Sequence, residues 1–591
     1  MEYAVDQASV AIGVTDDALD PGFFFGAEMQ VTRGTPAPMS PGDHVLSGTY
    51  HTAMQLHQPM EPSVTMARWC DGQMLLHDST QGVYASRDYV ATSLGIPPER
   101  VKVLSPYVGG GFGAKNQMWP HQALAAHLAR ALQCPVCLQL TRADMAVASG
   151  HRSDTRQEVM LHAGADGTLR MLRHISHVPT SMHGGFFEPC GLNSLMIYRS
   201  DAVEVRHRVH RKNIATPTPF RAPGETPGSF AVETALDELA FELHIDPLEI
   251  RRRSVPARDA YHDRPWSSNQ LLKCYEAGAE RFGWQPGPVM PRARREGNEL
   301  VGYGVATTAY PAPALAAAVR LRLFRRGPIV VETSATDIGT GMYTILAQTV
   351  ADDLAVPMAD IEVRLGDSSL PYAPTAGRSK STASVLPAAR LACRALREKL
   401  RQISGLSPGF GNVAMSELLD RAGIDELVAD GTSGGIAQPQ ACSFYSFGAH
   451  FVEVRVDEQL ARIRVSRVVS ALDCGRIVNA KTAASQIKGG IVFGIGMALM
   501  EKAEFDPNAC RLVNDNLADY HVPVNADIPD IDVLFVEHPD LQFNDLGARG
   551  LGEIALPGTA AAIGNALFSA TGVRIRRLPI TAVAILCKQV L

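Results

Sequence analysis

The segment from Gly547 to Gly558 contains a single carboxylate, Glu553, between glycine-rich turns and a run of small residues. Glycine lacks a Cβ and reaches positive φ at little cost, so such turns let the backbone approach a bulky group closely. An acid held there among apolar residues would be poorly solvated, which raises its pKa toward the range of a general base. A surface carboxylate beside a helix N-terminus is the alternative interpretation of this segment.

Six further loops share one sequence pattern, in which a strand-like run leads into glycine and small polar residues and then into a helix. They lie at 79–82, 109–115, 220–225, 337–344, 374–382 and 485–496. Successive backbone N–H groups in such a loop form a concavity for oxyanions or oxo groups. The loop at 109–115 fits neither the P-loop nor the dinucleotide spacing. Any one loop is by default a structural turn, but six together with Glu553 predict a long, polar, phosphate-bearing ligand between two domains.

Length and charge limit the possible classes of protein. A chain of 591 residues exceeds a single hydrophobic core. Its net charge of −6, from 55 basic and 61 acidic residues, is too small to indicate nucleic-acid binding. No apolar run has the length of a membrane span, and the N-terminus lacks the features of a secretory signal, so we do not expect the chain to export itself.

The cysteines and histidines indicate no metal cluster. Ten scattered cysteines form no disulfide framework and lack the spacing that holds a plant-type iron–sulfur cluster. Cys134 and Cys137 have a ligand-like spacing; a redox pair is possible, but two small residues packing a strand are favoured. We interpret His57, His121 and His151 as packed or surface histidines.

Helix-like and strand-like segments alternate, which predicts an α+β fold with mixed sheets and packed helices. Helices are expected at 121–132, 229–253 with a break at Asp246-Pro247, 342–354 and 387–403, and strands at 319–323 and 329–332. Residues 404–447 predict a long loop with one short helix. Pro, Arg and Gly cluster within 256–300, which indicates a boundary there and two domains, 1–270 and 271–591.

An ordered set of motifs resembles the molybdenum-binding subunit of the xanthine oxidase family. The motifs are His57–Pro62, Asp78–Gly82, GGGFGAK at 109–115, FRAPG at 220–224, GTGMYT at 339–344, Asp473–Gly475, Gln486–Gly490, GLGE ending at Glu553, and the segments 570–574 and 578–581. The resemblance spans about residues 45–590 and is strongest to the three-subunit bacterial aldehyde oxidoreductases. It implies two large molybdopterin-binding domains, and separate partner subunits that hold [2Fe-2S] clusters and FAD.

The resemblance also implies a cofactor and roles for residues. The cofactor would be molybdopterin cytosine dinucleotide, whose dithiolene rather than any side chain holds the molybdenum. Glu553 would be the general base, and Arg221 would stabilise charge on the substrate oxygen, with a salt bridge to Glu225 or a helix-cap contact as its alternative. Gln81 would hydrogen-bond an oxo ligand. The other expected cofactor-binding residues are Gly110, Gly111, Phe112, Gly113, Gly339, Thr340, Gly341, Ala376, Gly377, Arg378, Ser379 and Gln486.

Two departures from the family pattern are visible. Members usually begin with an additional N-terminal α/β module, and this chain starts just after it, so we expect a separate chain to supply that module or the gene product to be split or degenerate. The pterin loop normally carries small residues where Arg378 and Lys380 stand. Both cations could add phosphate contacts, which we favour, or they could block the pocket.

Asn116 bears on the substrate. Purine-oxidising relatives place a glutamate directly after the lysine of GGGFGxK, and this chain has Asn116 there. The missing polar anchor favours an aldehyde, aromatic or bulky, that is oxidised to a carboxylic acid with water as the oxygen source. A hydroxylase of N-heterocycles and a scaffold without molybdenum are the alternatives. We expect the chain in the cytoplasm, or in the periplasm if a partner carries the export signal.

Overall fold

Four large mixed sheets organise the chain in the computed structural model, which describes residues 18–24, 27–36, 38–259, 261–404, 415–436, 440–506 and 511–587. Each of these four sheets contains one parallel pair of strands among antiparallel neighbours. Helices pack against the sheets, and the expected α+β class is confirmed. The described elements fall into two units with the same order of strands.

The first unit starts with β4 (His44–Thr52) and then forms a lobe. The lobe consists of β5 (Val64–Cys70), β6 (Gln73–Asp78), α1 (Val83–Leu94), β7 (Val101–Leu104), α2 (Pro120–Leu132) and β8 (Val136–Gln139). Its strand order is β7-β6-β5-β8. The chain then returns to the sheet of β4 through β9 (Thr155–Ala163), β10 (Leu169–Ser181) and β11 (Ala202–Lys212), and it ends in α5 (Glu225–Glu242).

The second unit repeats this order of strands. From β13 (Glu299–Pro311) the chain forms a lobe of β14 (Leu315–Phe324), β15 (Ile329–Glu332), α8 (Met342–Leu354), β16 (Ile361–Arg364), α9 (Ser381–Ser404), α10 (Met415–Ala422) and β17 (Glu426–Gly435). The strand order of this lobe, β16-β15-β14-β17, matches that of the first. It returns through β18 (Tyr445–Asp457), β19 (Ile463–Asp473), α11 (Ala480–Leu499) and β22 (Asp530–Phe535) to α12 (Thr559–Thr571). Helices α10 and α11 are additions to the shared order.

Shorter elements complete the described chain. The strands are β1 (Phe23–Phe24), β2 (Ala27–Glu28), β3 (Gln30–Arg33), β12 (Arg294–Glu296), β20 (Phe505–Asp506) and β21 (Arg511–Leu512). The helices are α3 (Arg142–Ala148), α4 (Leu192–Met196), α6 (Pro247–Arg253), α7 (Leu271–Phe282) and α13 (Ala582–Leu586). β3 joins the edge of the first sheet beside β11, and β12 joins the second beside β13.

Helices α5 and α12 join the two units. α5 contacts β4 and β9 of the first sheet and also α12, which packs on β13 and β18 of the second. Close packing on β13 needs glycine, because a Cβ on Gly302 would stand 2.0 Å from the carbonyl oxygen of Ala566. Gly304 points to the same face two residues on and meets Ala562 in the same way. One hydrophobic core therefore includes residues from both units.

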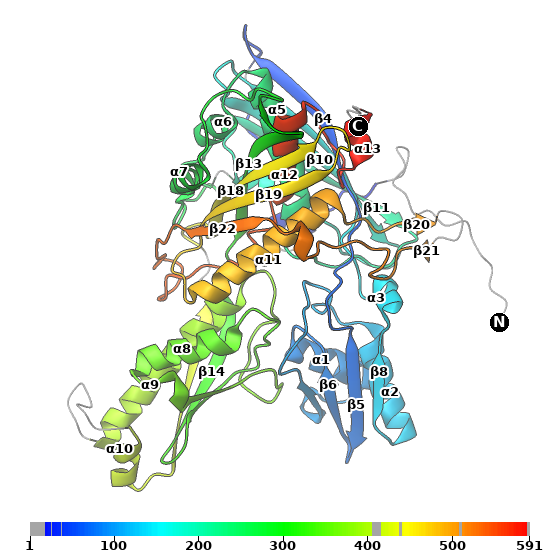
Figure 1. Cartoon of the computed structure of the whole chain (residues 1–591). Coiled ribbons are helices and arrows are strands. Elements are labelled where there is room, and N and C mark those ends of the chain that lie inside the picture. The colour runs from blue at the N-terminus through cyan, green and yellow to red at the C-terminus, as the bar shows by residue number, and fades with distance from the viewer. Residues whose placement is uncertain are drawn as a thin grey trace, which may run out of the picture.

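The two lobes extend from this body in the same direction, as Figure 1 shows. α2 covers β5 and β8 of the first lobe, and α9 covers β14 and β17 of the second. The lobes touch through an antiparallel bridge between Leu104 and Asp367, next to a hydrogen bond of 2.6 Å from Ser105 N to Gly366 O. The loops that follow β6, β7, β15 and β16 are brought together in this way.

Several sequence expectations need correction. The expected boundary region contains helix α7, and the expected long loop contains strand β17, which pairs with β14, while residues 405–414 and 437–439 lie outside the described part. Helix α9 begins at Ser381, so Pro387 lies inside it. Cys134 and Cys137 are both exposed and do not pack a strand. The division of the chain at residue 270 stays a prediction.

Candidate active site

A cavity of about 920 Å³ is lined by loops from both units. Thirteen of the expected site residues lie on its wall: Gln81, Gly110, Phe112, Gly113, Arg221, Gly339, Thr340, Ala376, Gly377, Arg378, Ser379, Gln486 and Glu553. Gly111 packs instead against Gln81, where a Cβ would stand 2.6 Å from Oε1, and Gly341 is the N-cap of α8. Both shape the loops behind the wall.

The repeated topology explains why these loops meet. Residues 79–82 follow β6 as 337–341 follow β15, and residues 109–115 follow β7 as 374–380 follow β16. In the same way, the FRAPG loop precedes α5 and the loop with Glu553 precedes α12. Each unit therefore contributes three corresponding loops to the cavity, and α11 of the second unit adds Gln486.

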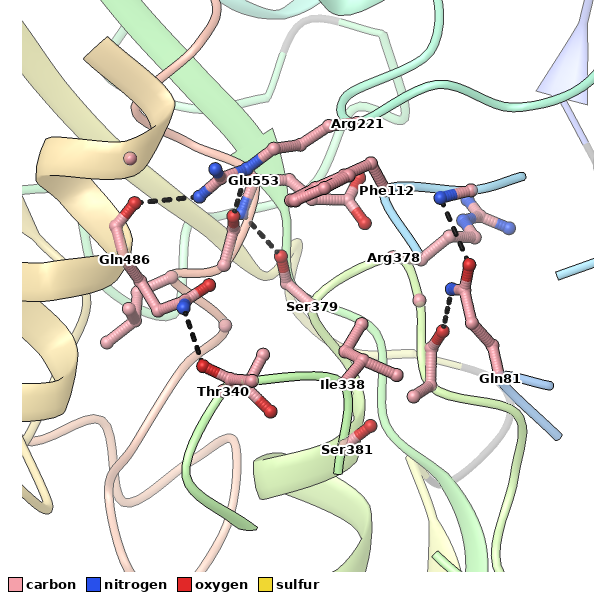
Figure 2. Close-up of a pocket in the computed structure, with 18 of the residues that line it drawn as sticks. Gln81, Phe112, Arg221, Ile338, Thr340, Arg378, Ser379, Ser381, Gln486 and Glu553 are labelled. Carbon is pink, nitrogen blue, oxygen red and sulfur yellow. Dashed lines mark hydrogen bonds between the residues drawn. The ribbon is translucent and has the colours of Figure 1, made fainter. Parts of the chain in front are cut away.

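Glu553 is fixed by both units. Its backbone N–H donates to Ser379 Oγ at 3.0 Å, and its Oε2 accepts a hydrogen bond of 3.1 Å from Ala222 N. Tyr310, on β13, lies near the Glu553 carboxyl group, and burial together with that negative charge raises the pKa of its hydroxyl. Figure 2 shows the carboxylate at the centre of the lining residues. These contacts hold the acid in one orientation at the cavity wall.

Arg221 is buried next to Glu553. Its Nε donates to Gly552 O at 2.8 Å and its Nη2 donates to Gln486 O at 2.7 Å (Figure 2). Burial lowers its pKa to about 10, while the charge of Glu553 acts in the opposite direction. The guanidinium therefore remains charged at neutral pH. Its hydrogen bonds connect the FRAPG loop to α11 and to the loop of Glu553, and they do not include the salt bridge to Glu225 that was its alternative role.

Gln81 joins the two lobes. Its Oε1 accepts from Gly113 N at 3.1 Å, and its Nε2 donates to Ala376 O at 2.6 Å. Its backbone carbonyl accepts from Ala376 N at 2.8 Å. One amide side chain thereby sets the spacing between the glycine loop of the first lobe and the pterin-type loop of the second.

A buried ion pair supports the glycine loop at 109–115. Lys115 is 1% exposed and its Nζ lies 2.5 Å from Glu61 Oε2, which also accepts from Gly109 N at 2.8 Å. Burial lowers the pKa of Lys115, and Glu61 opposes that shift. Phe112 has a φ of 56°, a left-handed conformation that is uncommon for a non-glycine residue. Such strained backbone is typical of functional sites.

The loop at 374–380 has two successive non-glycine residues with a left-handed backbone conformation. Arg378 and Ser379 have φ values of 53° and 54°. Lys380 is largely buried, and that burial together with the charge of Arg378 lowers its pKa. Both cations lie on the cavity wall near Glu553. Their spacing places two positive charges where the sequence predicted the pterin loop.

The loop at 337–341 is held by the side chain of Asp337. Asp337 Oδ1 accepts from the backbone N–H groups of Gly339, Thr340 and Gly341 at 2.9–3.2 Å, which closes the turn before α8. Gln486 Nε2 approaches Gly339 O at 3.4 Å and links α11 to this turn. In the sequence, Asp337 was identified only as the first residue of the loop at 337–344 and was given no role. A carboxylate directly before a Gly-x-Gly turn is the sequence feature that could have indicated this role.

The donors on the wall suit an anionic ligand with further polar groups. Arg221, Arg378 and Lys380 supply positive charge, and hydroxyl and amide groups surround them at Thr340, Ser379, Ser381, Thr382 and Gln486. A Cβ on Gly339 would meet no atom within 4 Å, and one on Gly377 would meet none closer than 3.8 Å. These glycines leave open wall that a ligand can occupy, so the residues fit a phosphate-bearing organic cofactor.

The described residues contain neither a metal-binding cluster nor a membrane-spanning helix. No group of three or more His, Cys, Asp or Glu side chains in this part of the chain could hold a metal ion. None of its helices is both long and apolar enough to cross a membrane.

The fold and the site define a protein that binds a phosphate-bearing cofactor between two repeated units. Two models of a molybdopterin cofactor-binding domain match residues 25–255 and 277–529. The aldehyde oxidoreductase molybdenum-binding subunit PaoC of Escherichia coli (strain K12) is 36% identical over 546 residues, covering 91% of this chain and 74% of that protein. The chain belongs to the molybdenum-binding subunits of the xanthine oxidase family.

Two further relatives show the range of the family. The putative xanthine dehydrogenase molybdenum-binding subunit XdhA of Escherichia coli (strain K12) is 31% identical over 578 residues, covering 91% of this chain and 76% of that protein. Among solved structures, quinoline 2-oxidoreductase from Pseudomonas putida 86 aligns with a TM-score of 0.83 at 25% identity, covering 95% of this chain and 78% of that one. The relatives therefore act on different substrates according to their names.

Proposed function

We propose that the protein oxidises aldehydes, aromatic ones above all, to carboxylic acids with water as the source of the added oxygen. The reaction removes two electrons and two protons from the aldehyde and one water molecule. The electrons leave through partner subunits that hold [2Fe-2S] clusters and FAD. The observation that carries this proposal is the position of Glu553 beside the charged Arg221 on the wall of a 920 Å³ cavity.

The cofactor of the proposal is molybdopterin in its cytosine dinucleotide form. When bound, it supplies the two-electron acceptor and the reactive oxygen, and the protein supplies position and proton transfer. We assign the pterin and its phosphates to the wall residues Gln81, Gly110, Phe112, Gly113, Gly339, Thr340, Ala376–Ser379 and Gln486, while Gly111 and Gly341 shape the loops behind them. Arg378 and Lys380 add charge-assisted donors to the phosphates in this assignment.

Glu553 is the general base of the proposed reaction. Its carboxylate accepts the proton of the attacking oxygen, and the contacts from Ala222 and Ser379 keep it aimed at the reacting atoms. Arg221 remains cationic and stabilises the negative charge that develops on the substrate oxygen. Fixed donors of this kind do not have to reorganise during the reaction, and that is the source of their effect.

The wall near Asn116 supports an aldehyde over a purine. Asn116 lies on the cavity wall directly after Lys115, and no carboxylate occupies that position to anchor a purine ring. Phe112, Phe493 and Leu192 add apolar surface on which an aromatic ring can pack. The identity to an aldehyde oxidoreductase subunit over most of the chain supports the same choice.

Hydroxylation of an N-heterocycle is the second candidate. The favouring observation is the structural similarity to quinoline 2-oxidoreductase. It needs the same base and the same cofactor, so the two candidates differ only in the substrate that reaches Glu553.

Elemental analysis followed by a substrate assay tests the proposal. The chain is purified with its co-expressed partners, its molybdenum content is measured, and dye-linked oxidation of benzaldehyde and of quinoline is followed on the same sample. We expect near-stoichiometric molybdenum and benzaldehyde turnover that Glu553→Gln lowers by roughly 10²–10⁴-fold at unchanged molybdenum content. Turnover of quinoline without turnover of benzaldehyde would favour the second candidate, hydroxylation of N-heterocycles. A folded complex without molybdenum would contradict an enzymatic function and favour the alternative that the chain is a non-catalytic scaffold subunit.

A further inference from the structure

Glu225 is a second carboxyl group on the cavity wall, to which the proposed reaction assigns no role. It is the first residue of α5, directly after the FRAPG loop, and it is 5% exposed. Its Oε2 is buried and has no hydrogen-bond partner among the described residues. Buried carboxyl oxygens are normally hydrogen-bonded, so an oxygen without a partner on a residue of the cavity wall indicates a group that binds there.

The surroundings of Glu225 favour its neutral form. Burial raises its pKa to about 8; an interaction with its own backbone N–H and the charge of Arg378 act against this shift, and Glu553 and Glu188 add to it. The other titratable groups that face it are Tyr310 of β13, Tyr445 of β18, and Cys190. Only one of these neighbours is a cation, and two are acids. At neutral pH, Glu225 is therefore a carboxylic acid that can donate one hydrogen bond.

The guanidinium of Arg221 does not already fill this role alone. Its Nε and Nη2 donate to the carbonyl oxygens of Gly552 and Gln486, so its charge acts on the substrate but these two N–H groups do not. The Glu553 carboxylate can only accept. The three remaining N–H groups of the guanidinium can still donate, and a neutral acid on the same cavity wall supplies a further donor.

We propose that Glu225 is a substrate-binding residue whose carboxylic acid group donates a hydrogen bond to the carbonyl oxygen of the aldehyde. The inference rests on the proposed function and adds a residue to it. The carbonyl oxygen gains negative charge as the carbon is attacked, so a fixed donor binds the transition state more tightly than the ground state. A carboxylic acid kept neutral in an apolar site is an established way to build such a donor.

This arrangement predicts a pH effect with a definite sign. Below a pH of about 8, Glu225 is protonated and donates. Above that pH it ionises, the donor is lost, and a second negative charge lies near Glu553. Turnover therefore falls on the alkaline side, and the fall belongs to Glu225.

Three variants test the inference in the complete complex. Glu225→Gln keeps a donor and removes the ionisation, Glu225→Ala removes both, and Glu188→Gln removes the neighbouring buried carboxyl group. We expect Glu225→Ala to lower kcat for benzaldehyde by roughly 100-fold. Glu225→Gln retains most of the activity at neutral pH and loses the alkaline fall, which Glu188→Gln preserves. Molybdenum content and melting temperature are measured for each variant to exclude failure of folding or loading.

A binding measurement separates this inference from the proposed function. Benzamide carries a carbonyl group and is not an aldehyde, and its affinity for each variant is measured against pH by calorimetry. The wild-type affinity falls above a pH of about 8, while that of Glu225→Gln does not change with pH. An unchanged kcat in Glu225→Ala, or an alkaline fall retained in Glu225→Gln, would overturn the inference. Absence of aldehyde turnover with a pH-dependent affinity for benzamide would overturn only the proposed function.

Discussion

The backbone N–H of Glu553 donates to the hydroxyl of Ser379 at 3.0 Å, across 174 residues of sequence. Ser379 has a left-handed backbone conformation. The loop that contains Glu553 packs closely against it, because a Cβ on Gly550 would stand 2.4 Å from the Ser379 carbonyl oxygen. The corresponding contact in the first unit joins Arg221 N to Phe112 O at 2.9 Å. In both units, the loop before the last helix is therefore held by the loop after the third lobe strand.

The first prediction concerns this contact. We expect Ser379→Ala to lower kcat for benzaldehyde by about five- to tenfold, because a typical hydrogen bond contributes roughly 1 kcal/mol to holding a group in place. Ser369→Ala, which removes an exposed hydroxyl that bonds Asp367, is the matched control. Steady-state kinetics with the molybdenum content of each variant make the comparison. Equal kcat values in the two variants would show that Ser379 does not orient Glu553.

The second prediction concerns the ion pair beneath the glycine loop. Lys115 is 1% exposed and Glu61 is 32% exposed, so the two partners differ in what their loss leaves behind. Glu61→Gln leaves a buried ammonium without its counter-charge and is expected to destabilise the protein by roughly 1–3 kcal/mol. Lys115→Met leaves a carboxylate that water can reach, and it is expected to cost less. Melting temperatures in the opposite order would contradict this asymmetry.

The third prediction concerns acid stability. Burial lowers the pKa of His57 from 6.5 to about 3. The imidazole therefore binds a proton more readily in the unfolded chain than in the folded one. The stabilisation is complete above a pH of 6.5 and is lost as the pH falls toward 3, at a cost of roughly 2 kcal/mol at about pH 5. His57→Gln is expected to reduce the slope of melting temperature against pH. The exposed His183, changed to Gln, is the control, and equal slopes would refute the assignment.

The fourth prediction concerns a buried pair that connects the units. Arg251 Nε donates to Glu233 Oε2 at 2.8 Å, both side chains are 0% exposed, and the same oxygen accepts from Thr307 N of β13 at 2.9 Å. Arg251→Met is expected to cost roughly 3–5 kcal/mol, because it leaves a buried charge unpaired.

The exposed pair of Arg253 with Glu249 provides the control for Arg251. Arg253→Met is expected to lower the free energy of unfolding by less than about 1 kcal/mol, because the side chains of Arg253 and Glu249 are both exposed to water. Unfolding in urea measures both variants. Similar midpoints would show that the buried pair is no stronger than the surface one.

Local patterns predicted much of the fold. Met342 and Leu354 bound helix α8 as expected, because a glycine turn precedes the apolar periodicity and a left-handed residue ends it. Strand β17 was missed since its glycines and polar residues predict a loop, and only pairing with β14 makes it a strand. Helix α7 was missed because the Pro and Gly residues beyond its ends obscured its period.

The repeat of the two units could not be predicted from the sequence. It consists of the order and pairing of strands, and no fixed spacing of side chains marks it. The same limit applies to the site. Glycine loops and Glu553 were visible as motifs, but Tyr310 lies on a strand whose sequence gives no sign of the cavity. Glu225 was considered only as a partner for Arg221, since its buried oxygen without a hydrogen-bond partner is a property of the folded pocket.

The distribution of the wall residues along the chain has a consequence for biosynthesis. Gln81 is translated early, whereas Gly552 and Glu553 leave the ribosome only after both lobes have been made. A nascent chain that has folded its first unit therefore presents half of the wall, with the Arg221 guanidinium lacking the Gly552 and Gln486 carbonyls that hold it. The complete wall therefore exists only once the second unit has been synthesised, and we expect the cofactor to bind after that point.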